Sequence, residues 1–345
     1  MTVKVLTPGL LTTIQDLGRY GSQKYGVIVS GAMDSYSLRI ANLLVGNAEG
    51  EGAMEITLFG TSLQFQEDTL IAITGGDLLA TIDGENAPLW RPLLVKKGEV
   101  LQFKSAVIGA RAYVAFAGGI EIPEVMGSKS TYLSAAIGGI HGRVLQKNDS
   151  FQCGEMNEIS QSFIHKINAA NGYPTWSVNY NLLINLHQSQ VIRVLKGTEF
   201  DRFNNKSKKT LFGDPYILTT QADRMGSRLK GSPLLLDEEF ELLSEAVTYG
   251  TIQVPSNGQP IILMADRQTT GGYPKIGQVI TADLSSLAQL RPGAAIHFVE
   301  ASLEGAINEL FKKEQIINEI KKAIHFKGIS MKGNDKMKIN ELKEL

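Results

Sequence analysis

The chain has 345 residues, of which 43% are apolar, and its 34 basic and 35 acidic side chains leave a formal net charge of −1. That length predicts about two domains with ample material for a core, and the balanced charge argues against nucleic acid or an anionic membrane as a partner. A single cysteine, Cys153, rules out a disulfide within the chain and a cysteine-rich zinc site. Since the sequence has no long apolar segment, we expect a cytoplasmic protein.

Short runs in which apolar and polar residues alternate dominate the chain and predict β-strands. These runs span 54–65, 78–84, 99–103, 111–119, 191–197 and 294–300. Helical periodicity is clear at 35–44, where Ser35 is the expected N-cap, and at 301–326. The second helix carries one apolar stripe, formed by Leu303, Ile307, Leu310, Ile317, Ile320 and Ile324. The Lys-rich segment 327–345 has little pattern and is expected to be a flexible tail.

An internal repeat relates the two halves of the chain. Segment 55–61 matches 245–251 at a constant offset of 190 residues, and 96–103 matches 291–298 at an offset of 195. Ordered matches of this kind predict two related structural units. We therefore expect a mainly β protein with few helices. Its expected parts are a β-barrel unit at 1–115, a Gly-rich connecting region at 116–187, a second β-barrel unit at 188–300, a C-terminal helix at 301–326 and the tail.

One polar loop departs from this repeat. The segment “ADRQTTGGYP” (265–274) follows an apolar run, whereas the matching place in the first unit, 74–77, is the short turn “TGGD”. Since a β unit needs only a turn there, the enlarged polar loop predicts a site built onto the scaffold. The alternative is that Asp266 and Thr270 only satisfy the turn backbone while Arg267 covers the surface.

Familiar catalytic motifs are absent from the sequence. The string “MGSKST” (126–131) has the residue types of a phosphate-binding loop in the wrong order. The five histidines show no metal-ligand spacing, and Cys153 has no histidine near it in the sequence. We therefore expect no metal site and no covalent catalysis by this chain alone.

Polar side chains in Gly-rich loops form a second set of candidates. They are Gln15, Asp16, Arg19, Ser30, Asp34, His141, Arg143, Arg224, Ser227 and Arg228. Each one alone could be turn chemistry or a surface ion pair worth under about 1 kcal/mol. Together they could line one cleft for a small amide, urea-like or carboxylate ligand, to which arginine offers a two-pronged contact.

Five segments carry a resemblance to a known family. They are “GLLTTIQDLGRYG” (9–21), “SGAMD” (30–34), “GSKST” (127–131), “RMGSRL” (224–229) and “GTIQVPSNGQPIILMADRQTTGGYPKIG” (250–277). In these segments the chain resembles the allophanate hydrolase subunit 2 family, also called the biotin-dependent carboxyltransferase family, and the likeness runs from about residue 1 to 305. The resemblance implies cyclophilin-like β-barrel domains, in agreement with the repeat.

The resemblance also implies partners and a choice of activities. Family members serve in an ATP-dependent 5-oxoprolinase together with its A and B subunits, in urea carboxylase, and in regulation as an antagonist of a histidine-kinase inhibitor. A biotin carrier needs a lysine flanked by methionine in a hairpin, and the nearest string, “DKMKIN” (335–340), lies in the charged tail. We therefore expect no covalently attached biotin. A stand-alone chain of this length favours the 5-oxoprolinase component. We expect this component to be inactive alone and to act, as part of a complex that consumes ATP, on a small amide or lactam.

Under this interpretation the polar loop supplies the site. Asp266, Arg267 and Gln268 would hold the lactam and its carboxylate, Arg224 would stabilise developing negative charge, and Glu245 would be a general base if burial raises its pKa. Further expected substrate-binding residues are Ser227, Asn257, Thr269, Thr270, Gly271, Gly272 and Tyr273.

Overall fold

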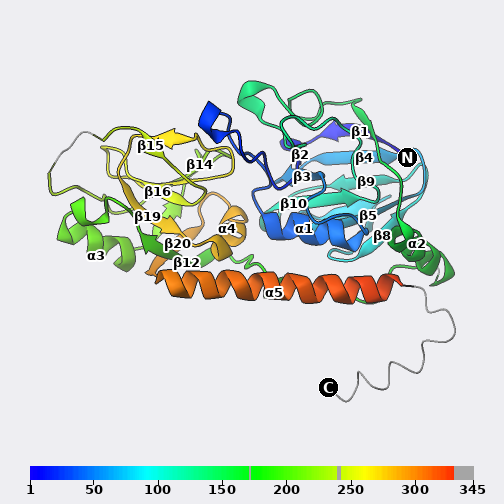
Figure 1. The fold of residues 1–345 in the computed structure, drawn as a ribbon. Coiled ribbons are helices and arrows are strands. Elements are labelled where there is room, and N and C mark those ends of the chain that lie inside the picture. Colours follow the sequence, from blue (N-terminus) through cyan, green and yellow to red (C-terminus); the bar gives the residue numbers. More distant parts are fainter. Residues whose placement is uncertain (171, 239–241, 330–345) are drawn as a thin grey trace, which may run out of the picture.

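The computed structural model describes residues 1–170, 172–238 and 242–329. Figure 1 shows a two-sheet unit from the first half of the chain beside a barrel from the second half, with helix α5 (Leu303–Gly328) beneath both. The expected mainly β fold is confirmed. Most of the tail expected at 327–345, including the string 335–340, lies outside the described residues.

Two antiparallel sheets make up the first unit. One has six strands, in the spatial order β11 (Ser150–Gln152), β1 (Thr2–Pro8), β4 (Thr61–Phe65), β9 (Val100–Phe103), β6 (Ala80–Ile82) and β7 (Glu85–Asn86). The other has five, in the order β2 (Leu11–Gln15), β3 (Ala53–Thr57), β10 (Ile108–Phe116), β5 (Thr69–Asp77) and β8 (Pro92–Val95). Apolar side chains from both sheets form a common core, in which Val5, Phe103 and Val114 are no more than 1% exposed.

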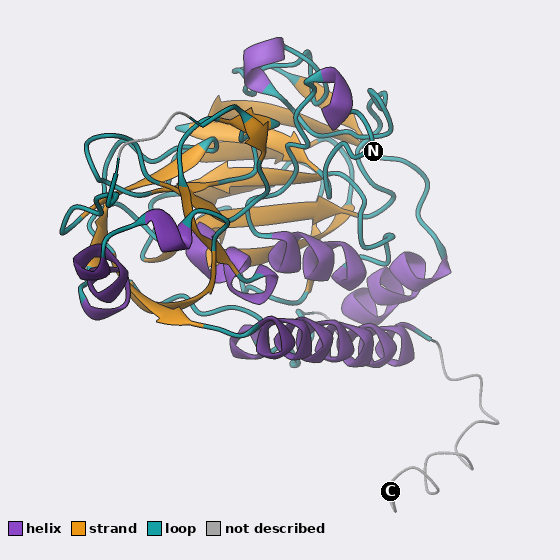
Figure 2. Cartoon of the chain, turned by 60° about the vertical axis from the view of Figure 1, so that its left-hand side comes forward, coloured by secondary structure: helices purple, strands orange, loops and turns teal. Residues whose placement is uncertain are grey.

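Helices contribute the second core of this unit. Side chains from α1 (Ser35–Leu44), α2 (Glu158–Ala170) and α5 form one buried cluster with residues of the five-stranded sheet such as Ala72 and Ala115. The longest helices therefore gather on one side of the strands (Figure 2). The Thr74 hydroxyl donates a 2.7 Å hydrogen bond to the Ser37 carbonyl and attaches α1 to β5.

Helix α1 has the bounds that the sequence predicts, but its N-cap is Asp34 and not Ser35. Asp34 has an extended backbone, and its carboxylate accepts hydrogen bonds from the Ser37 N–H at 3.0 Å and the Ser37 hydroxyl at 2.6 Å. Aspartate and serine are both favourable N-caps, so residue type alone does not decide between neighbours. The extended backbone conformation of Asp34 identifies this residue as the N-cap.

Seven strands close the barrel of the second unit. Their spatial order is β12 (Ser189–Lys196), β19 (Lys275–Val279), β16 (Thr251–Gln253), β17 (Ile261–Leu263), β14 (Gly226–Lys230), β13 (Tyr216–Leu218) and β20 (Ala295–Glu300). β12 pairs with β20 in parallel, which closes the ring. The barrel core contains Ile252, Ile262 and Phe298, and also Met33 from the first unit. A side chain of one unit thus completes the core of the other.

Helix α5 lies under both units, but its apolar stripe is packed along only part of its length. Ile317 and Ile324 are 0% and 4% exposed, whereas Leu303 and Ile307 at the other end are 64% and 43% exposed. The apolar stripe is therefore buried toward its C-terminal end and only partly covered at the start of the helix. No helix within the described ranges has the length and apolar character needed to cross a membrane.

Some parts of the fold differ from the sequence interpretation. The first unit has two sheets where the sequence predicts a barrel, and the region 116–187 adds β11 beside β1 as well as connecting the units. Helices α2, α3 (Asn205–Gly213) and α4 (Thr281–Ala288) are not among the helices that the sequence predicts. For α4 the reason is that seven of its eight residues are buried, which leaves no contrast between two faces.

The matched segments of the internal repeat do have similar local structure. β4 and β16 each begin directly after a glycine with positive φ, Gly60 at 95° and Gly250 at 88°. Segments 96–103 and 291–298 each pass through a turn into a strand, β9 and β20. Local similarity therefore coexists with different sheet topologies.

The buried Cys153 provides a test of the first unit's packing. It is 5% exposed, and burial raises the pKa of its thiol to about 12. Because the thiolate is the reactive form, iodoacetamide at about pH 8 should alkylate unfolded protein readily and native protein hardly at all. Mass spectrometry after a timed exposure measures this. Equal alkylation of the two states would show that the region around Cys153 is open in the native protein.

Candidate functional site

The polar loop that the sequence singles out joins β17 to β19. Within it, β18 (Thr270–Gly271) pairs with β15 (Glu245–Ala246) as a two-stranded ribbon separate from the barrel sheet. Gly271 approaches the Gln253 side-chain amide so closely that any larger residue would displace that amide. The loop is therefore held against the barrel by close packing as well as by backbone pairing.

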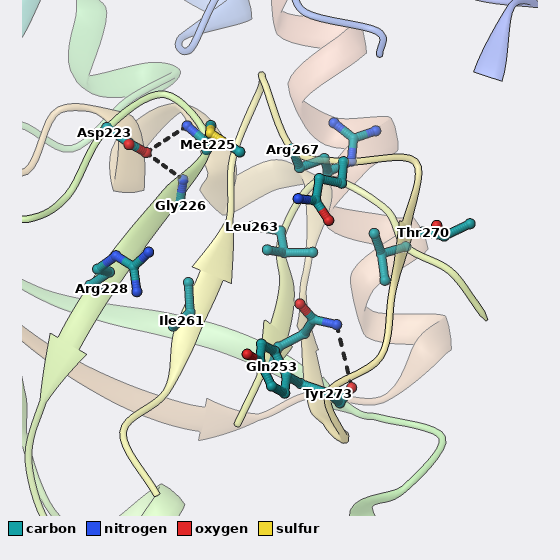
Figure 3. Close-up of a pocket in the computed structure, with 12 residues that line it drawn as sticks. Asp223, Met225, Gly226, Arg228, Gln253, Ile261, Leu263, Arg267, Thr270 and Tyr273 are labelled. Carbon is teal, nitrogen blue, oxygen red and sulfur yellow. Dashed lines mark hydrogen bonds between the residues drawn. The ribbon is translucent and has the colours of Figure 1, made fainter. Parts of the chain in front are cut away.

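A hollow of about 170 Å³ lies beside this loop (Figure 3). Ile261 and Leu263 contribute apolar surface, and Gln253, Thr270 and Tyr273 supply polar groups. The Gln253 Nε2 donates a 3.3 Å hydrogen bond to the Tyr273 carbonyl, which leaves the Gln253 Oε1 as an acceptor. Since pockets for drug-sized ligands have volumes of about 300–1,000 Å³, this hollow suits a smaller molecule.

Arg228, on β14, supplies a cation to this hollow. Its side chain is exposed and makes no hydrogen bond or ion pair within the part of the chain that the structure describes. Asp223, another lining residue, has its Oδ1 occupied by the N–H groups of Met225 and Gly226, at 2.8 and 2.9 Å. An unpaired guanidinium can bind a carboxylate with two parallel hydrogen bonds. The hollow is thus equipped for a small carboxylate or amide.

Arg224 and Asp266 do not line this hollow, because they are paired with each other in the interior. Arg224 Nε and Nη2 donate to the two Asp266 oxygens at 2.8 and 2.9 Å, and Nη1 donates to Glu55 of the first unit. The side chains of Arg224, Asp266 and Glu55 are 5%, 7% and 1% exposed. This burial prevents the direct ligand contacts that the sequence interpretation gives to Arg224 and Asp266.

Further hydrogen bonds tie this ion cluster, Glu55–Arg224–Asp266, into both units. Glu55 accepts from the Met33 N–H at 2.9 Å and from the Tyr113 hydroxyl at 2.7 Å. Burial opposes the charge of Arg224, but Glu55 and Asp266 outweigh it and raise the pKa of the guanidinium above its ordinary value. Buried charges that are paired and hydrogen-bonded in this way are costly to separate.

Gln15, Asp16 and Arg19 do come together, but around a loop of the chain and not around a cleft. Asp16 accepts from the Ser128 hydroxyl at 2.7 Å, and Gln15 donates to the Thr131 carbonyl at 3.2 Å. Arg19 is 0% exposed and donates to backbone carbonyls of the same loop at 2.7 and 2.9 Å. These side chains hold the string 126–131, whose residue types resemble a phosphate-binding loop.

Asp34, His141 and Arg143 lie elsewhere, so the prediction of one shared cleft is wrong. Asp34 caps α1 and accepts from the Gln289 amide at 2.8 Å, and burial raises the pKa of its carboxyl group. Arg143 pairs with Asp149 at 2.7 Å, and His141 is exposed beside a separate hollow. Polar residues next to glycines here satisfy caps and turns, each in its own place.

The two glutamates matched by the repeat have different environments. Glu55 is buried in the ion cluster, whereas Glu245 is 54% exposed and pairs with Lys275 at 2.5 Å. The burial on which the expected general-base role of Glu245 depends is therefore absent. Since β15 is a two-residue strand in the outer ribbon and β3 is a central strand, equivalent positions in the repeat do not have equivalent exposure.

Of the predicted site residues, the structure brings Arg228, Arg267, Gln268, Thr270 and Tyr273 to the hollow. The others lie apart: Asn257 borders a neighbouring hollow, Ser227 is buried within β14, Thr269 and Gly271 belong to the ribbon backbone, and Gly272 is exposed in the following turn. Figure 3 shows the Arg267 side chain extending away from Gln253 and Tyr273. Sequence reasoning missed Gln253, although a lone amide in the apolar string “TIQV” (251–254) is a usable signal.

The matching place in the first unit is not the plain turn that the sequence predicts. Thr74 to Asp77 form the end of β5, where Gly75 has a φ of 85° and the register against β10 shifts. Gly75 and Gly76 are buried there. The polar loop of the second unit therefore stands in place of a buried, bulged strand end.

The fold is a two-sheet unit joined to a closed barrel, with a small polar hollow beside the barrel. The family described as carboxyltransferase domain, subdomain A and B, matches residues 25–300. The chain belongs to this family.

Several relatives match over most of the chain. It is 40% identical over 325 residues to the 5-oxoprolinase C subunit of Escherichia coli, covering 94% of this chain and 99% of that one. It is 39% identical over 312 residues to the protein of the same name from Haemophilus influenzae, covering 90% and 95%. The structure of Kluyveromyces lactis urea carboxylase is similar with a TM-score of 0.83 and 29% identity, over 92% of this chain and 29% of that chain.

Replacement of Arg224 tests the ion cluster. Arg224→Met leaves Glu55 and Asp266 without their cation, so the free energy of unfolding should fall by about 3–5 kcal/mol. Urea unfolding followed by circular dichroism measures this. The matched control is Arg228→Met in the exposed hollow, which should change stability by no more than about 0.5 kcal/mol. Equal stability of the two variants would contradict the assignment of Arg224 to a structural ion cluster.

Proposed function

We propose that the chain is the C subunit of an ATP-dependent 5-oxoprolinase, which opens 5-oxo-L-proline to L-glutamate. The similarity to two proteins that carry the name of this 5-oxoprolinase component supports the proposal, because it extends over at least 90% of this chain and 95% of each of them. The urea carboxylase of Kluyveromyces lactis matches this chain over 29% of its own length. A role as one component of a multi-subunit 5-oxoprolinase is therefore better supported than urea carboxylation.

The hollow beside the polar loop is the proposed place for 5-oxoproline. This substrate is a five-membered lactam with one carboxylate. Arg228 would bind the carboxylate, and the side-chain amides of Gln253 and Gln268 would bind the lactam N–H and C=O groups. Tyr273, which is 51% exposed, would cover the ring. In this proposal the chain binds and orients the substrate.

ATP chemistry is assigned to the complex with the A and B subunits, the latter of the allophanate hydrolase subunit 1 type. In the proposed reaction ATP phosphorylates the lactam oxygen, water adds to the activated carbon, the C–N bond breaks and phosphate leaves. Lys129, in the string 126–131, forms an ion pair with Glu51 and is therefore not free to hold phosphate. Biotin has no covalent role in this proposal.

Reconstitution tests the proposed function. ATP-dependent release of glutamate from 5-oxoproline should require this chain together with the A and B subunits, and the purified chain alone should release none. A coupled glutamate assay with each component omitted in turn measures this. Activity of the single chain would contradict the assignment of ATP chemistry to the partners, and an inactive complete complex would refute the function.

Replacement of Arg228 tests the proposed substrate site within the reconstituted complex. Arg228→Gln removes the carboxylate partner, so kcat/KM for 5-oxoproline should fall at least about tenfold, or roughly 1.4 kcal/mol of transition-state stabilisation. The control is Lys206→Gln, which removes the same charge from an exposed position on α3 that does not line the hollow. If both variants retain full kcat/KM, the substrate binds elsewhere.

A further inference from the structure

A second and larger hollow, of about 600 Å³, lies between the two units and α5. It is formed by the segment 17–35, by barrel residues near Tyr249 and by the first turns of α5. In Figure 1 the segment 17–35 is the dark blue loop between the two units, and α5 begins beneath the barrel. The volume is within the range of about 300–1,000 Å³ that is usual for small-molecule sites, which often occur between domains.

Most of the surface of this inter-unit hollow is apolar. Its apolar side chains include Leu17, Val29, Met33, Leu284, Ile307 and Leu310. The exposed end of the α5 stripe, with Leu303 64% exposed and Ile307 43% exposed, is part of the same surface. Contiguous exposed apolar surface of this kind is typical of a binding site and is costly to leave in contact with water.

Arg267 alone carries a formal charge among the described residues that line the inter-unit hollow. Its guanidinium lies 5.8 Å from the centre of the Tyr249 ring, and Nη1 makes one long contact of 3.4 Å to the Met264 carbonyl. Its Nε is buried and has no acceptor within the described part of the chain. Much of the hydrogen-bonding capacity of this guanidinium is therefore unused.

No carboxylate of the described chain neutralises Arg267 in an ion pair. The adjacent Asp266 cannot do so, because Arg224 occupies both of its oxygens and the Ser30 hydroxyl donates to one of them at 2.7 Å. Burial lowers the pKa of Arg267 from its ordinary value. The hollow thus contains a partly desolvated cation, which an anionic ligand would stabilise.

We infer that the inter-unit hollow is a second ligand site, which binds a molecule with an apolar body and a single carboxylate. Arg267 receives the carboxylate, since a planar guanidinium fits carboxylate geometry with two hydrogen bonds. The apolar side chains of the segment 17–35 and of α5 surround the body of the ligand. One cation balances one negative charge, so a monoanion fits the site better than a phosphate dianion.

This site is distinct from the hollow proposed for 5-oxoproline, although Arg267 borders both. Of these two hollows, Arg228 lines only the first, and Ala306 of α5 lines only the second. Substitution of Ala306 therefore probes the second site without changing the lining of the first. The test measures binding to the purified full-length chain, so its result does not depend on whether the 5-oxoprolinase assignment is correct.

The experiment is calorimetry with two probes that have the same apolar body, 4-phenylbutyrate and the uncharged 4-phenylbutanamide. The wild-type chain should bind the acid at one site, with an affinity at least about tenfold higher than for the amide. Arg267→Gln should abolish this difference, because it removes the charge and keeps a polar side chain. Ala306→Trp should weaken the binding of both probes by filling the hollow, and Lys206→Gln, at an exposed position on α3 that does not line the hollow, should change neither affinity. Circular dichroism melting confirms that each variant is folded.

Three results would overturn the inference. They are a dissociation constant for the acid weaker than about 1 mM, equal affinity of wild type for acid and amide, and an unchanged preference for the acid in the folded Arg267→Gln variant. If neither probe binds while Ala306→Trp abolishes assembly with the A and B subunits, the hollow is a protein interface. That outcome also overturns the ligand site.

Discussion

Arg224 lies between two carboxylates that come from different units, and the arrangement of those units depends on this contact. Glu55 belongs to β3 of the two-sheet unit, whereas Arg224 and Asp266 belong to loops of the barrel unit. Taking such charges out of water costs several kcal/mol per ion unless each finds a partner. Glu55 meets Arg224 only when the units are docked. Met33, inserted into the barrel core, adds an apolar contact at the same junction.

The same contact determines where the polar loop can place its side chains. Arg224 and Ser30 hold Asp266 in the interior, and this fixes the position from which the rest of the polar loop begins. Gln268 then lines the small polar hollow, while the Arg267 guanidinium extends away from Gln253 and Tyr273 (Figure 3). Three consecutive polar residues thus differ in environment: Asp266 lies in the buried ion cluster, Arg267 borders both hollows, and Gln268 lines the small polar hollow.

The two hollows differ in the chemistry that they offer. The small one combines amide groups with the exposed, unpaired Arg228, and the larger one combines apolar surface with the partly buried Arg267. A guanidinium in a drier environment interacts more strongly with an anion, because water screens the charge less. A scaffold of one barrel and one two-sheet unit can therefore present arginine in two different ways, from strand β14 and from the polar loop. The family relationship does not by itself distinguish these roles.

The features that depend on neighbours along the chain follow from local sequence patterns. Alternating patterns located strands such as β9, β12 and β20, a 3.6-residue period located α1 and α5, and the polar insertion after 260–264 located the region of the candidate site. The accessibility of the polar residues, in contrast, depends on long-range contacts in the fold. Glu55 and Glu245 occupy matched positions, yet one is buried beside Arg224 and the other is exposed beside Lys275. Those partners lie 169 and 30 residues away along the chain, and burial depends on such distant contacts, which no local pattern encodes.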